Sequence, residues 1–250
     1  MIVFLEIMGV EFVGKSLLLE IEGIKTKKKK RILVISDLHL GYEGSVRREG
    51  VFLPMGAYEE TINDMNKIFE KIGKVDMVVI LGDLKHEIGA ILEEEWKEVL
   101  DFIDYLSKNT AEIIIVKGNH DVMVQFIIKA RKVKVVDNFI YNGLAFLHGD
   151  RDFKEIYNEK IKTWVMGHLH PAINLKDKIG VKEEKYKCFL IGRYKGKKII
   201  ILPSFFPLNE GSDPRHSNLK IPWKFKFGSF NVKSIGENLE VLDFGRLGKL

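Results

Sequence analysis

Five short polar motifs contain most of the side chains in this sequence that could bind metal ions or transfer protons. Each motif directly follows a short apolar run, and in chain order they are Asp37-Leu38-His39, Gly82–His86, Gly118–Asp121, His148–Asp150 and Gly167–His170. Six of the seven histidines lie in these motifs, and only His216 lies outside them. Scattered structural histidines would not be concentrated in this way, so we interpret the motifs as parts of one site.

The apolar runs before the motifs are short and rich in β-branched residues, which predicts strands. Ligands of a parallel α/β sheet bind beyond the carboxyl ends of its strands, so the motifs are expected to converge. Side chains two positions apart in an extended segment point to the same side. We therefore expect Asp37 and His39 to face one ion, and His168 and His170 to face the same cleft.

The mixture of carboxylates and imidazoles suits Mn²⁺, Fe²⁺ or Zn²⁺ better than Ca²⁺ or Mg²⁺, which prefer oxygen ligands. The candidate metal ligands are Asp37, His39, Asp83, Asn119, His148, His168 and His170. This set is too large for one ion and fits two ions about 3.5–4 Å apart that share a carboxylate. Such a pair lowers the pKa of a bridging water and neutralises phosphoryl oxygens, which is the chemistry of phosphate-ester hydrolysis.

Strands and helices are predicted to alternate in the first part of the chain. The strands that lead into the motifs are Ile32–Ile35, Met77–Leu81, Glu112–Val116, Leu144–Leu147 and Trp164–Met166. Helical spacing of apolar residues predicts helices over Gly56–Ile72 and Leu92–Leu106, with a short one near Val122–Ala130. Gly41–Pro54 is rich in glycine and charge, and is expected to be a loop with one helical turn. This alternation predicts a largely parallel sheet with helical crossovers.

Other segments are predicted to form strands joined by turns. The further strands are Ile2–Ile7, Leu17–Ile24, Val133–Val136, Phe139–Tyr141, Tyr186–Tyr194, Lys198–Leu202, Phe225–Val232 and Leu239–Phe244. Turns are expected at Glu11–Gly14 and Lys195–Gly196, and the charged run Lys25–Arg31 is interpreted as a solvated loop. After Pro171 the chain is predicted to be mostly strands. We expect one domain over residues 1–250, in which residues of about 31–171 form the motif-bearing core and residues 172–250 add a β-rich C-terminal part.

Composition and charge indicate which partners and which cellular location to expect for the protein. The formal net charge is +5 and the pI is about 9.0, which permits a polyanionic partner such as nucleic acid without requiring one. The abundance of Lys and Glu is a bias also seen in proteins from hot environments. A single cysteine, Cys188, excludes an intrachain disulfide and fits a cytoplasmic location. The N-terminus lacks a basic n-region, and no apolar stretch is long enough for a membrane span, so neither a signal peptide nor a membrane partner is expected.

In their order, the five motifs resemble the motif set of the calcineurin-like metallophosphoesterase superfamily. The pattern is similar to archaeal SbcD-related phosphoesterases and to the bacterial ligase-associated nuclease PdeM, which have segments like Arg47–Pro54, Cys188–Leu190 and Leu202–Phe205. The resemblance implies a single-domain α/β fold, a four-layer α-β-β-α sandwich. It also implies that Asp37, His39 and His170 hold one metal, that Asn119, His148 and His168 hold the other, and that Asp83 bridges them.

The resemblance further implies how such a site would work. His120 would be the general acid that protonates the leaving oxygen, and Asp121 would orient its loop. The nucleophile would be metal-bound hydroxide, so no covalent enzyme intermediate is expected. The two divalent ions would be Mn²⁺ as the first choice, with Fe²⁺, Zn²⁺ or Ni²⁺ as alternatives.

One motif helps to choose a substrate class. Many phosphomonoesterases of this superfamily have Asp and then Arg where this chain has His86 and Glu87, and a histidine there resembles the SbcD-type nucleases. Without the Arg, a bidentate clamp for a dianionic phosphate is lost, which favours a phosphodiester. Lys85 departs from the aromatic residue common in those nucleases. His86 is a catalytic candidate, with a purely hydrogen-bonding role as the alternative.

The expected partner is therefore nucleic acid or a nucleotide diester, and DNA-repair proteins are a partner class that the resemblance suggests. A small-molecule phosphomonoesterase or pyrophosphatase is the alternative enzyme, and a non-catalytic scaffold is the alternative from another class. Arg47 and Arg48 could bind substrate phosphates or be exposed loop charges. Arg193 lies in a basic hairpin, residues 182–198, which could form a nucleic-acid groove or a solvated surface.

Overall fold

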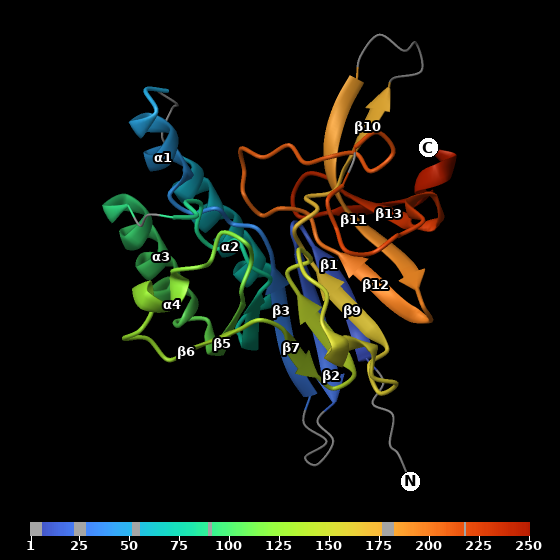
Figure 1. Ribbon diagram of the computed structural model, residues 1–250, viewed down its shortest axis with the longest axis horizontal. Coiled ribbons are helices and arrows are strands. Elements are labelled where there is room, and N and C mark those ends of the chain that lie inside the picture. Colours follow the sequence, from blue (N-terminus) through green and yellow to red (C-terminus); the bar gives the residue numbers. More distant parts are fainter. Residues whose placement is uncertain (1–6, 23–28, 52–55, 90–91, 177–182, 218) are drawn as a thin grey trace.

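The computed structural model describes residues 7–22, 29–51, 56–89, 92–176, 183–217 and 219–250. Its strands form two sheets that pack against each other, and helices α1 to α4 lie on the outer side of the first sheet (Figure 1). The expected α/β fold with two central sheet layers is confirmed. None of the described helices is both long enough and apolar enough to cross a bilayer.

The first sheet has six described strands in the order β1-β2-β3-β4-β5-β6. Their bounds are β1 Ile7–Val13, β2 Ser16–Glu22, β3 Lys29–Ile35, β4 Val75–Ile80, β5 Thr110–Val116 and β6 Val133–Val136. Strands β3 to β6 are parallel, whereas β1, β2 and β3 pair antiparallel. Because right-handed crossovers that advance in one direction put every connecting helix on one face, the other face is left to pack against the second sheet.

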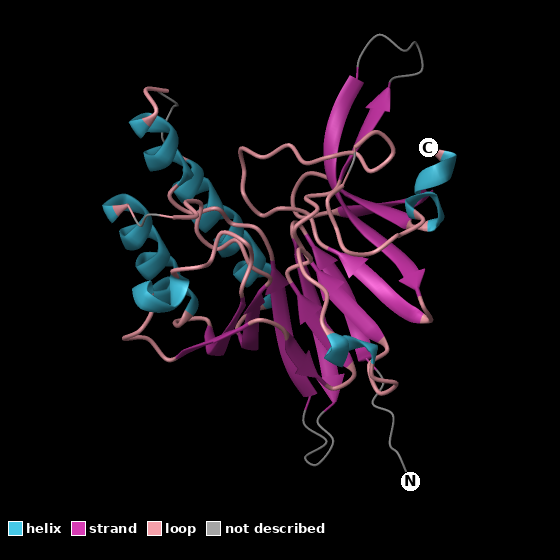
Figure 2. Cartoon of the chain, in the orientation of Figure 1, coloured by secondary structure: helices cyan, strands magenta, loops and turns pink. Residues whose placement is uncertain are grey.

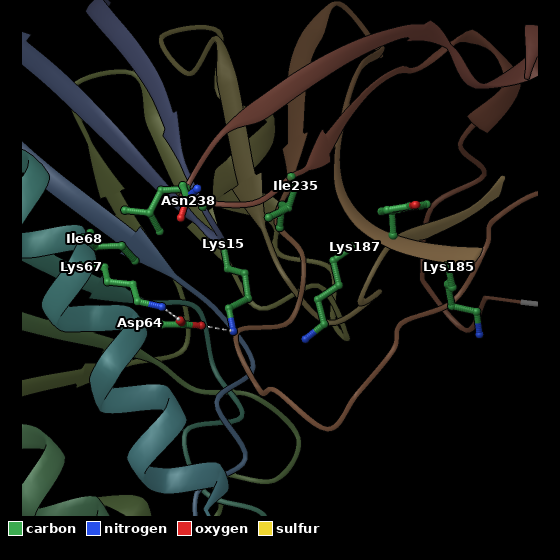
Figure 3. Close-up of a pocket in the computed structure, with 12 residues that line it drawn as sticks. Lys15, Asp64, Lys67, Ile68, Lys185, Lys187, Ile235 and Asn238 are labelled. Carbon is green, nitrogen blue, oxygen red and sulfur yellow. Dashed lines mark ion pairs between the residues drawn. The ribbon is translucent and has the colours of Figure 1, made fainter.

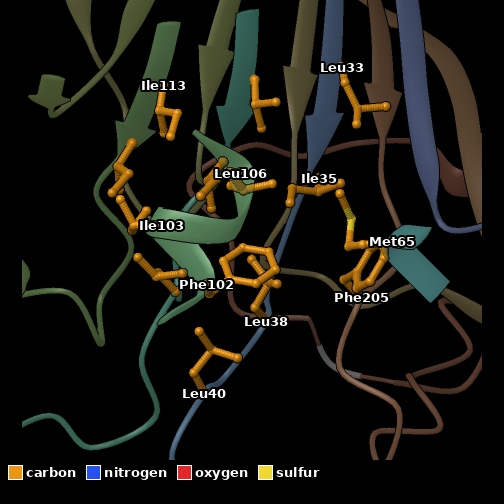
Figure 4. Packing of buried hydrophobic residues seen from close by; sticks show 14 of the residues in the cluster. Leu33, Ile35, Leu38, Leu40, Met65, Phe102, Ile103, Leu106, Ile113 and Phe205 are labelled. Carbon is orange, nitrogen blue, oxygen red and sulfur yellow. The ribbon is translucent and has the colours of Figure 1, made fainter. Parts of the chain in front are cut away.

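The helices cover the first sheet with their apolar faces. Their bounds are α1 Tyr42–Arg48, α2 Ala57–Ile72, α3 Glu93–Leu106 and α4 Val124–Ile127. Helix α2 buries Met65 and Ile68, and helix α3 buries Phe102, at spacings of one helical face. Figure 4 shows Phe102 of α3 near the carboxyl end of β3 at Ile35, with Phe205 and Met65 beside it. This packing fixes the level at which the strands end and the polar motifs begin.

The second sheet has eight described strands, in the order β14-β13-β11-β12-β9-β8-β7 with β10 paired to β11. Their bounds are β7 Phe139–Tyr141, β8 Leu144–Leu147, β9 Thr163–Met166, β10 Ala172–Lys176, β11 Glu183–Tyr194, β12 Lys197–Ile201, β13 Asn231–Ile235 and β14 Val241–Arg246. Strands β8, β9 and β12 are parallel. Every residue of β8 and β9 is buried, which explains why these strands are continuous apolar runs rather than alternating ones.

The outer face of the second sheet is covered by short 3-10 helices and aromatic side chains. The 3-10 helices are η1 Lys154–Tyr157, η2 Phe227–Ser229 and η3 Leu247–Lys249 (Figure 2). The ring of Trp164 lies 5.3 Å from that of Tyr157 and 5.6 Å from that of Trp223, measured between centroids. The fourth layer of the sandwich is therefore made of 3-10 turns and loops instead of long helices.

Helix α1 is longer than the single turn that the sequence predicts. Its buried residues include Glu43, whose carboxylate accepts hydrogen bonds from the backbone N–H groups of Gly56 at 2.9 Å and Ala57 at 3.2 Å. These N–H groups begin α2, which has no capping side chain of its own. These tertiary contacts of Glu43 thus stabilise α1, although Gly44 within it has a low helix propensity.

Some strand predictions were wrong in detail. Residues Glu11–Val13 belong to β1, so the turn lies at Gly14–Lys15. Within Phe225–Val232 the chain forms η2 before β13 begins at Asn231. Strand β10 was not predicted. Residues 1–6, 23–28, 52–54 and 182 of the expected segments lie outside the described residues.

Candidate metal centre

The structure brings the five motifs together at the carboxyl ends of β3, β4, β5, β8 and β9. The ring centroid of His39 lies 5.1 Å from that of His120 and 5.4 Å from that of His170. The rings of His148 and His168 are 4.8 Å apart. We call the seven candidate ligands in this region the metal cluster: Asp37, His39, Asp83, Asn119, His148, His168 and His170.

Three groups of side chains at this site could each hold a cation. Within each group, one ligand atom per residue lies within 4.8 Å of the others. The groups are Asp37 with His39 and His170, Asp83 with His148 and His168, and His39 with His86 and His120. The first two groups have no residue in common and contain both aspartates, so the arrangement offers two adjacent cation positions.

Asp83 lies between these two positions. Its Oδ2 atom is 3.9 Å from Nε2 of His39 and 3.4 Å from Nε2 of His148. Nε2 of His148 is also 3.2 Å from Oδ1 of Asn119 and 3.0 Å from Nδ1 of His168. One carboxylate oxygen therefore faces an imidazole from each group.

The backbone at the site adopts an unusual conformation. Five candidate ligands have a positive φ: Asp37 at 54°, His39 at 47°, Asp83 at 46°, His168 at 68° and His170 at 42°. The expectation that extended backbone aligns Asp37 with His39, and His168 with His170, is therefore wrong, although the side chains do converge. Left-handed backbone costs roughly 1 kcal/mol or more per residue and is typical of functional sites.

Cross-links between loops hold this strained backbone. The backbone N–H of Asp37 donates to the carbonyl of Gly82 at 3.1 Å, and that of His39 donates to Asp83 at 2.9 Å. Other donors fix the carboxylates themselves. Ser36 Oγ donates to Asp37 Oδ2 at 2.5 Å, and the N–H of His120 donates to Asp83 Oδ1 at 3.0 Å. Ser36 and the N–H of His120, which lie outside the candidate ligand set, thus help to orient both aspartates, and the N–H of His168 also donates to Asp37 at 3.1 Å.

Two motif glycines allow the loops to approach each other closely. A Cβ atom on Gly118 would lie 2.2 Å from Oδ1 of Asp83, and one on Gly167 would lie 1.7 Å from Oγ of Ser36. Real Cβ atoms do not approach this closely, so a side chain at either position would displace a carboxylate or its donor. Glycine at these positions is a requirement of the site geometry.

Burial and charge set the protonation of the cluster. Burial lowers the pKa of His39 to about 3, against the opposing effect of Asp83 and Asp37. Burial also lowers the pKa of His168. For Asp37, burial raises the pKa, but His170 and His148 lower it by a larger amount, so the net shift is downward. Neutral imidazoles beside ionised carboxylates form a donor set that is ready for a cation.

His148 shows that the carboxylates favour positive charge at this position. Its Nδ1 donates to the carbonyl of Leu81 at 2.7 Å, which directs Nε2 toward Asp83. Burial lowers the pKa of His148, but Asp83 and Asp37 outweigh burial and raise it to about 10. A cation that binds Nε2 would take the place of that proton.

The three candidate catalytic residues lie beside the metal cluster. Nδ1 of His120 donates to the backbone carbonyl of His86, and the two rings are stacked with centroids 5.7 Å apart. Asp121 is fully buried. Its carboxylate accepts from the backbone N–H groups of Gly118 at 2.9 Å and Leu84 at 3.0 Å. Burial, together with Asp83, raises the pKa of Asp121 to about 6.

The candidate substrate arginines lie away from this cluster. Arg47 and Arg48 are exposed at the end of α1, and Nη1 of Arg47 is 3.6 Å from Glu94. Arg193 is exposed. In the register of the sheet its backbone lies opposite Lys198 of β12, which lies opposite Thr163 at the start of β9. The candidate ligands follow the other end of β9, so Arg193 lies at the opposite end of the second sheet.

Several residues that contact the site carry no sequence signal. Glu95 of α3 is fully buried, and its Oε1 accepts from the N–H groups of His86 at 2.9 Å and Glu87 at 2.7 Å. Its Oε2 lies 3.7 Å from Nζ of the equally buried Lys85. In the sequence, Glu95 is one of three consecutive glutamates at a helix start, which usually face solvent.

The loop after β12 supplies two further contacts. Nδ2 of Asn209 lies 2.7 Å from Nδ1 of His170, and the ring of Phe206 lies 6.0 Å from that of His39. The ring of Tyr42 lies 4.9 Å from Phe206 and 4.8 Å from His86. An aromatic wall therefore borders the metal cluster on the side of His39.

A sequence model described as calcineurin-like phosphoesterase matches residues 30–231. The chain belongs to the calcineurin-like phosphoesterase family. Calcineurin-like phosphoesterases are hydrolases that use divalent metals, and the clustered histidines and aspartates of this chain are candidates to hold them. No curated protein matches the sequence.

Solved structures that are similar to this calcineurin-like phosphoesterase include a nuclease and a Vps29 protein. The nuclease MPE of Pseudomonas putida is similar with a TM-score of 0.61 and 17% identity, over 94% of this chain and 99% of that chain. Zinc-bound Vps29 of Entamoeba histolytica has a TM-score of 0.37 and 15% identity, over 86% of this chain and 99% of that chain. The likeness to the nuclease MPE, at 17% identity, shows a common fold and nothing finer.

Proposed function

We propose that this chain is a dinuclear metal-dependent phosphodiesterase that acts on nucleic acid or on a nucleotide diester. One observation carries the proposal: Asp83 Oδ2 lies between His39 and His148, which belong to two separate cation-competent groups. A shared carboxylate between two clustered donor sets is the arrangement that two-metal phosphoryl chemistry requires.

The donor atoms fit divalent cations. Among the described residues, the buried Nε2 of His170 makes no hydrogen bond, and it faces Oδ1 of Asp37 at 3.2 Å. Burying such an atom without a hydrogen bond is costly, and a bound cation would remove that cost. In the proposal, Asp37, His39 and His170 hold one ion. Asn119, His148 and His168 hold the other, and Asp83 contacts both. Manganese is the first choice, with iron, zinc and nickel as alternatives.

The chain's own residues would orient and protonate the substrate. Two divalent cations at these positions would lower the pKa of a water molecule and offset the charge of the phosphoryl group. Because Nδ1 of His120 is bonded to the carbonyl of His86, its Nε2 is the nitrogen left to protonate the leaving oxygen. Asp121 holds the loop that carries His120 through its bonds to Gly118 and Leu84.

A diester is favoured over a monoester by the residues after Asp83. Glu87 stands where a clamping arginine would bind a dianionic phosphate, and its Oε1 accepts from the hydroxyl of Ser45. His86 places a half-buried imidazole there, with its pKa lowered by burial and by His120. The structural neighbour described as a nuclease and the net charge of +5 support nucleic acid as the substrate class.

The test compares esters on the manganese-loaded protein. We expect a higher kcat/KM for bis(p-nitrophenyl) phosphate than for p-nitrophenyl phosphate, and turnover of at least one of single-stranded DNA, duplex DNA, RNA or a cyclic dinucleotide. Lys129→Ala, a change at an exposed lysine of the described chain, is the matched control and should leave both rates unchanged. A clear preference for the monoester would refute the diesterase assignment and favour a small-molecule phosphatase.

A further inference from the structure

A second site lies close to the metal cluster. A cleft of about 300 Å³ opens between α2, the turn from β1 to β2, strand β11 and the hairpin of β13 and β14 (Figure 3). Among the described residues that line it, Asp64 is the one carboxylate and four residues are lysines. We call this region the lysine cleft, after Lys15, Lys67, Lys185 and Lys187.

The lining carries an excess of positive charge. Asp64 forms ion pairs with Lys15 at 2.7 Å and with Lys67 at 3.8 Å, so one carboxylate is shared by two ammonium groups. Lys185 pairs at 3.3 Å with Glu210, whose side chain is 79% exposed. Exposed pairs of this kind are weak and leave most of the field of the lysine in place.

Lys187 differs from the other three lysines because the acceptors of its ammonium group are backbone carbonyls. Its Nζ donates to the backbone carbonyls of Ser204 at 3.1 Å and of Phe206, and within the described chain it forms no ion pair with a carboxylate. Burial lowers the pKa of Lys187 to about 7, and the charge of Lys15 lowers it further. A partly buried ammonium with only carbonyl partners is stabilised when an anion approaches.

The segment Ser204–Phe206 contacts both the lysine cleft and the metal cluster, because Lys187 donates to the carbonyls of Ser204 and Phe206. The N–H groups of Phe205 and Phe206 donate to the carbonyls of Ser36 at 2.8 Å and Asp37 at 3.1 Å. Nζ of Lys15 lies 4.8 Å above the ring of Phe205. The same segment therefore contacts cleft lysines and the backbone of a candidate metal ligand.

We propose that the lysine cleft binds a second phosphate group, away from the one that is hydrolysed. The inference rests on the phosphodiesterase function proposed above. The phosphate would come either from the same nucleic-acid strand as the scissile bond or from a free nucleotide. Ile235 and Leu239 in the lining offer apolar surface to a sugar or base next to that phosphate.

Binding can be measured without turnover. Fluorescence anisotropy of a short 5′-labelled oligothymidylate in EDTA, across a range of KCl concentrations, gives the dependence of log Kd on log salt. Each lost phosphate contact to a single strand lowers that slope by about 0.7. We expect this loss, with several-fold weaker binding, for Lys187→Met and for the double variant Lys67→Ala/Lys185→Ala.

The matched control is Lys129→Ala/Lys132→Ala, which removes two exposed lysines outside the cleft. It should keep the slope of the unmodified protein. If Lys187→Met does not fold, as judged by its melting curve, the double cleft variant carries the test alone. An unchanged slope in the folded cleft variants, or an equal change in the control, would overturn the proposal.

Competition distinguishes the two phosphate sources. If adenosine monophosphate displaces the oligonucleotide from the unmodified protein and binds more weakly to the cleft variants, the site holds a free nucleotide. If only the oligonucleotide responds to the cleft variants, the phosphate belongs to the strand. Failure of the manganese-loaded protein to cleave any diester would contradict the proposed function, whereas the salt slope reports on the cleft independently of cleavage.

Discussion

The metal cluster and the lysine cleft both contact the segment Ser204–Phe206, and they are built in opposite ways. The cluster combines the buried carboxylates of Asp37 and Asp83 with histidines. The cleft combines flexible lysine side chains around one shared carboxylate, Asp64. One region therefore favours cations and the other favours anions.

The difference extends to how each region is held. In the metal cluster, positive φ angles and glycines such as Gly118 fix short side chains on loops that hydrogen-bond to each other. In the lysine cleft, long side chains reach a common space from separate elements. A rigid constellation suits a fixed coordination geometry, whereas flexible cations suit a ligand whose position varies.

The largest expected effect comes from the shared carboxylate. Asp83→Asn should lower kcat/KM for bis(p-nitrophenyl) phosphate by roughly 1000-fold, because several kcal/mol of charge stabilisation would be lost. Steady-state kinetics with manganese measure this. The double variant Lys67→Ala/Lys185→Ala should keep that activity within a small factor, since this substrate has no second phosphate and these lysines pair with Asp64 and Glu210 instead of the segment Ser204–Phe206. Similar losses in the two variants would erase the distinction between the regions.

A buried support of the metal cluster should matter for stability. Glu95→Gln leaves the fully buried Lys85 without its carboxylate and should destabilise the fold by about 3–5 kcal/mol, measured by urea unfolding. Asp104→Asn, in the exposed pair with Arg131, is the control and should cost less than about 1 kcal/mol. Equal costs would show that burial of the first pair has no energetic consequence.

A closely packed glycine at the metal cluster should tolerate substitution less well than a glycine with open space around it. Gly118→Ala would push a methyl group against Asp83 and should cost about 1–3 kcal/mol together with metal affinity. Gly89→Ala has no atom within 4 Å of its added Cβ and should be nearly neutral. Thermal melts with and without manganese separate the two outcomes, and a neutral Gly118→Ala would argue against the tight loop contact.

The smallest effect is a pH dependence at the edge of the cluster. Burial raises the pKa of Glu98 from 4.5 to about 7, aided by Glu94 and Glu43. The folded state therefore holds this proton more tightly, and ionising Glu98 lowers stability as pH rises from 4.5 through 7. Relative to the unmodified protein, Glu98→Gln should raise the free energy of unfolding by about 1 kcal/mol more at pH 8 than at pH 5, after allowance for solvent screening. Urea unfolding at the two pH values measures this difference. A gain that does not change with pH would contradict this assignment.

The same contrast explains what the sequence could and could not predict. The ligands of the metal cluster follow strand ends within short motifs, so the sequence predicts that the motifs converge, and the family resemblance groups Asp37 with His170. The buried strands and the helix over residues 57–72 follow from apolar spacing, and both are confirmed. The family resemblance is confirmed by the match over residues 30–231.

What the sequence could not predict depends on contacts between distant segments. Glu95 looks like a solvated helix residue, yet it is buried because the loop at His86 needs an acceptor. Helix α1 forms because Glu43 completes the start of α2. The left-handed backbone at His39 is set by its bond to Asp83, and the four lysines of the cleft share no motif. None of these features has a local pattern that spacing rules can detect.

Metal stoichiometry tests the central claim most directly. After reconstitution with manganese and removal of free metal, elemental analysis should find two ions per chain. Asp83→Asn should hold one ion or none, because it removes the carboxylate that faces both donor groups. A single ion in the unmodified protein, or two ions undiminished in Asp83→Asn, would contradict a dinuclear centre that shares Asp83.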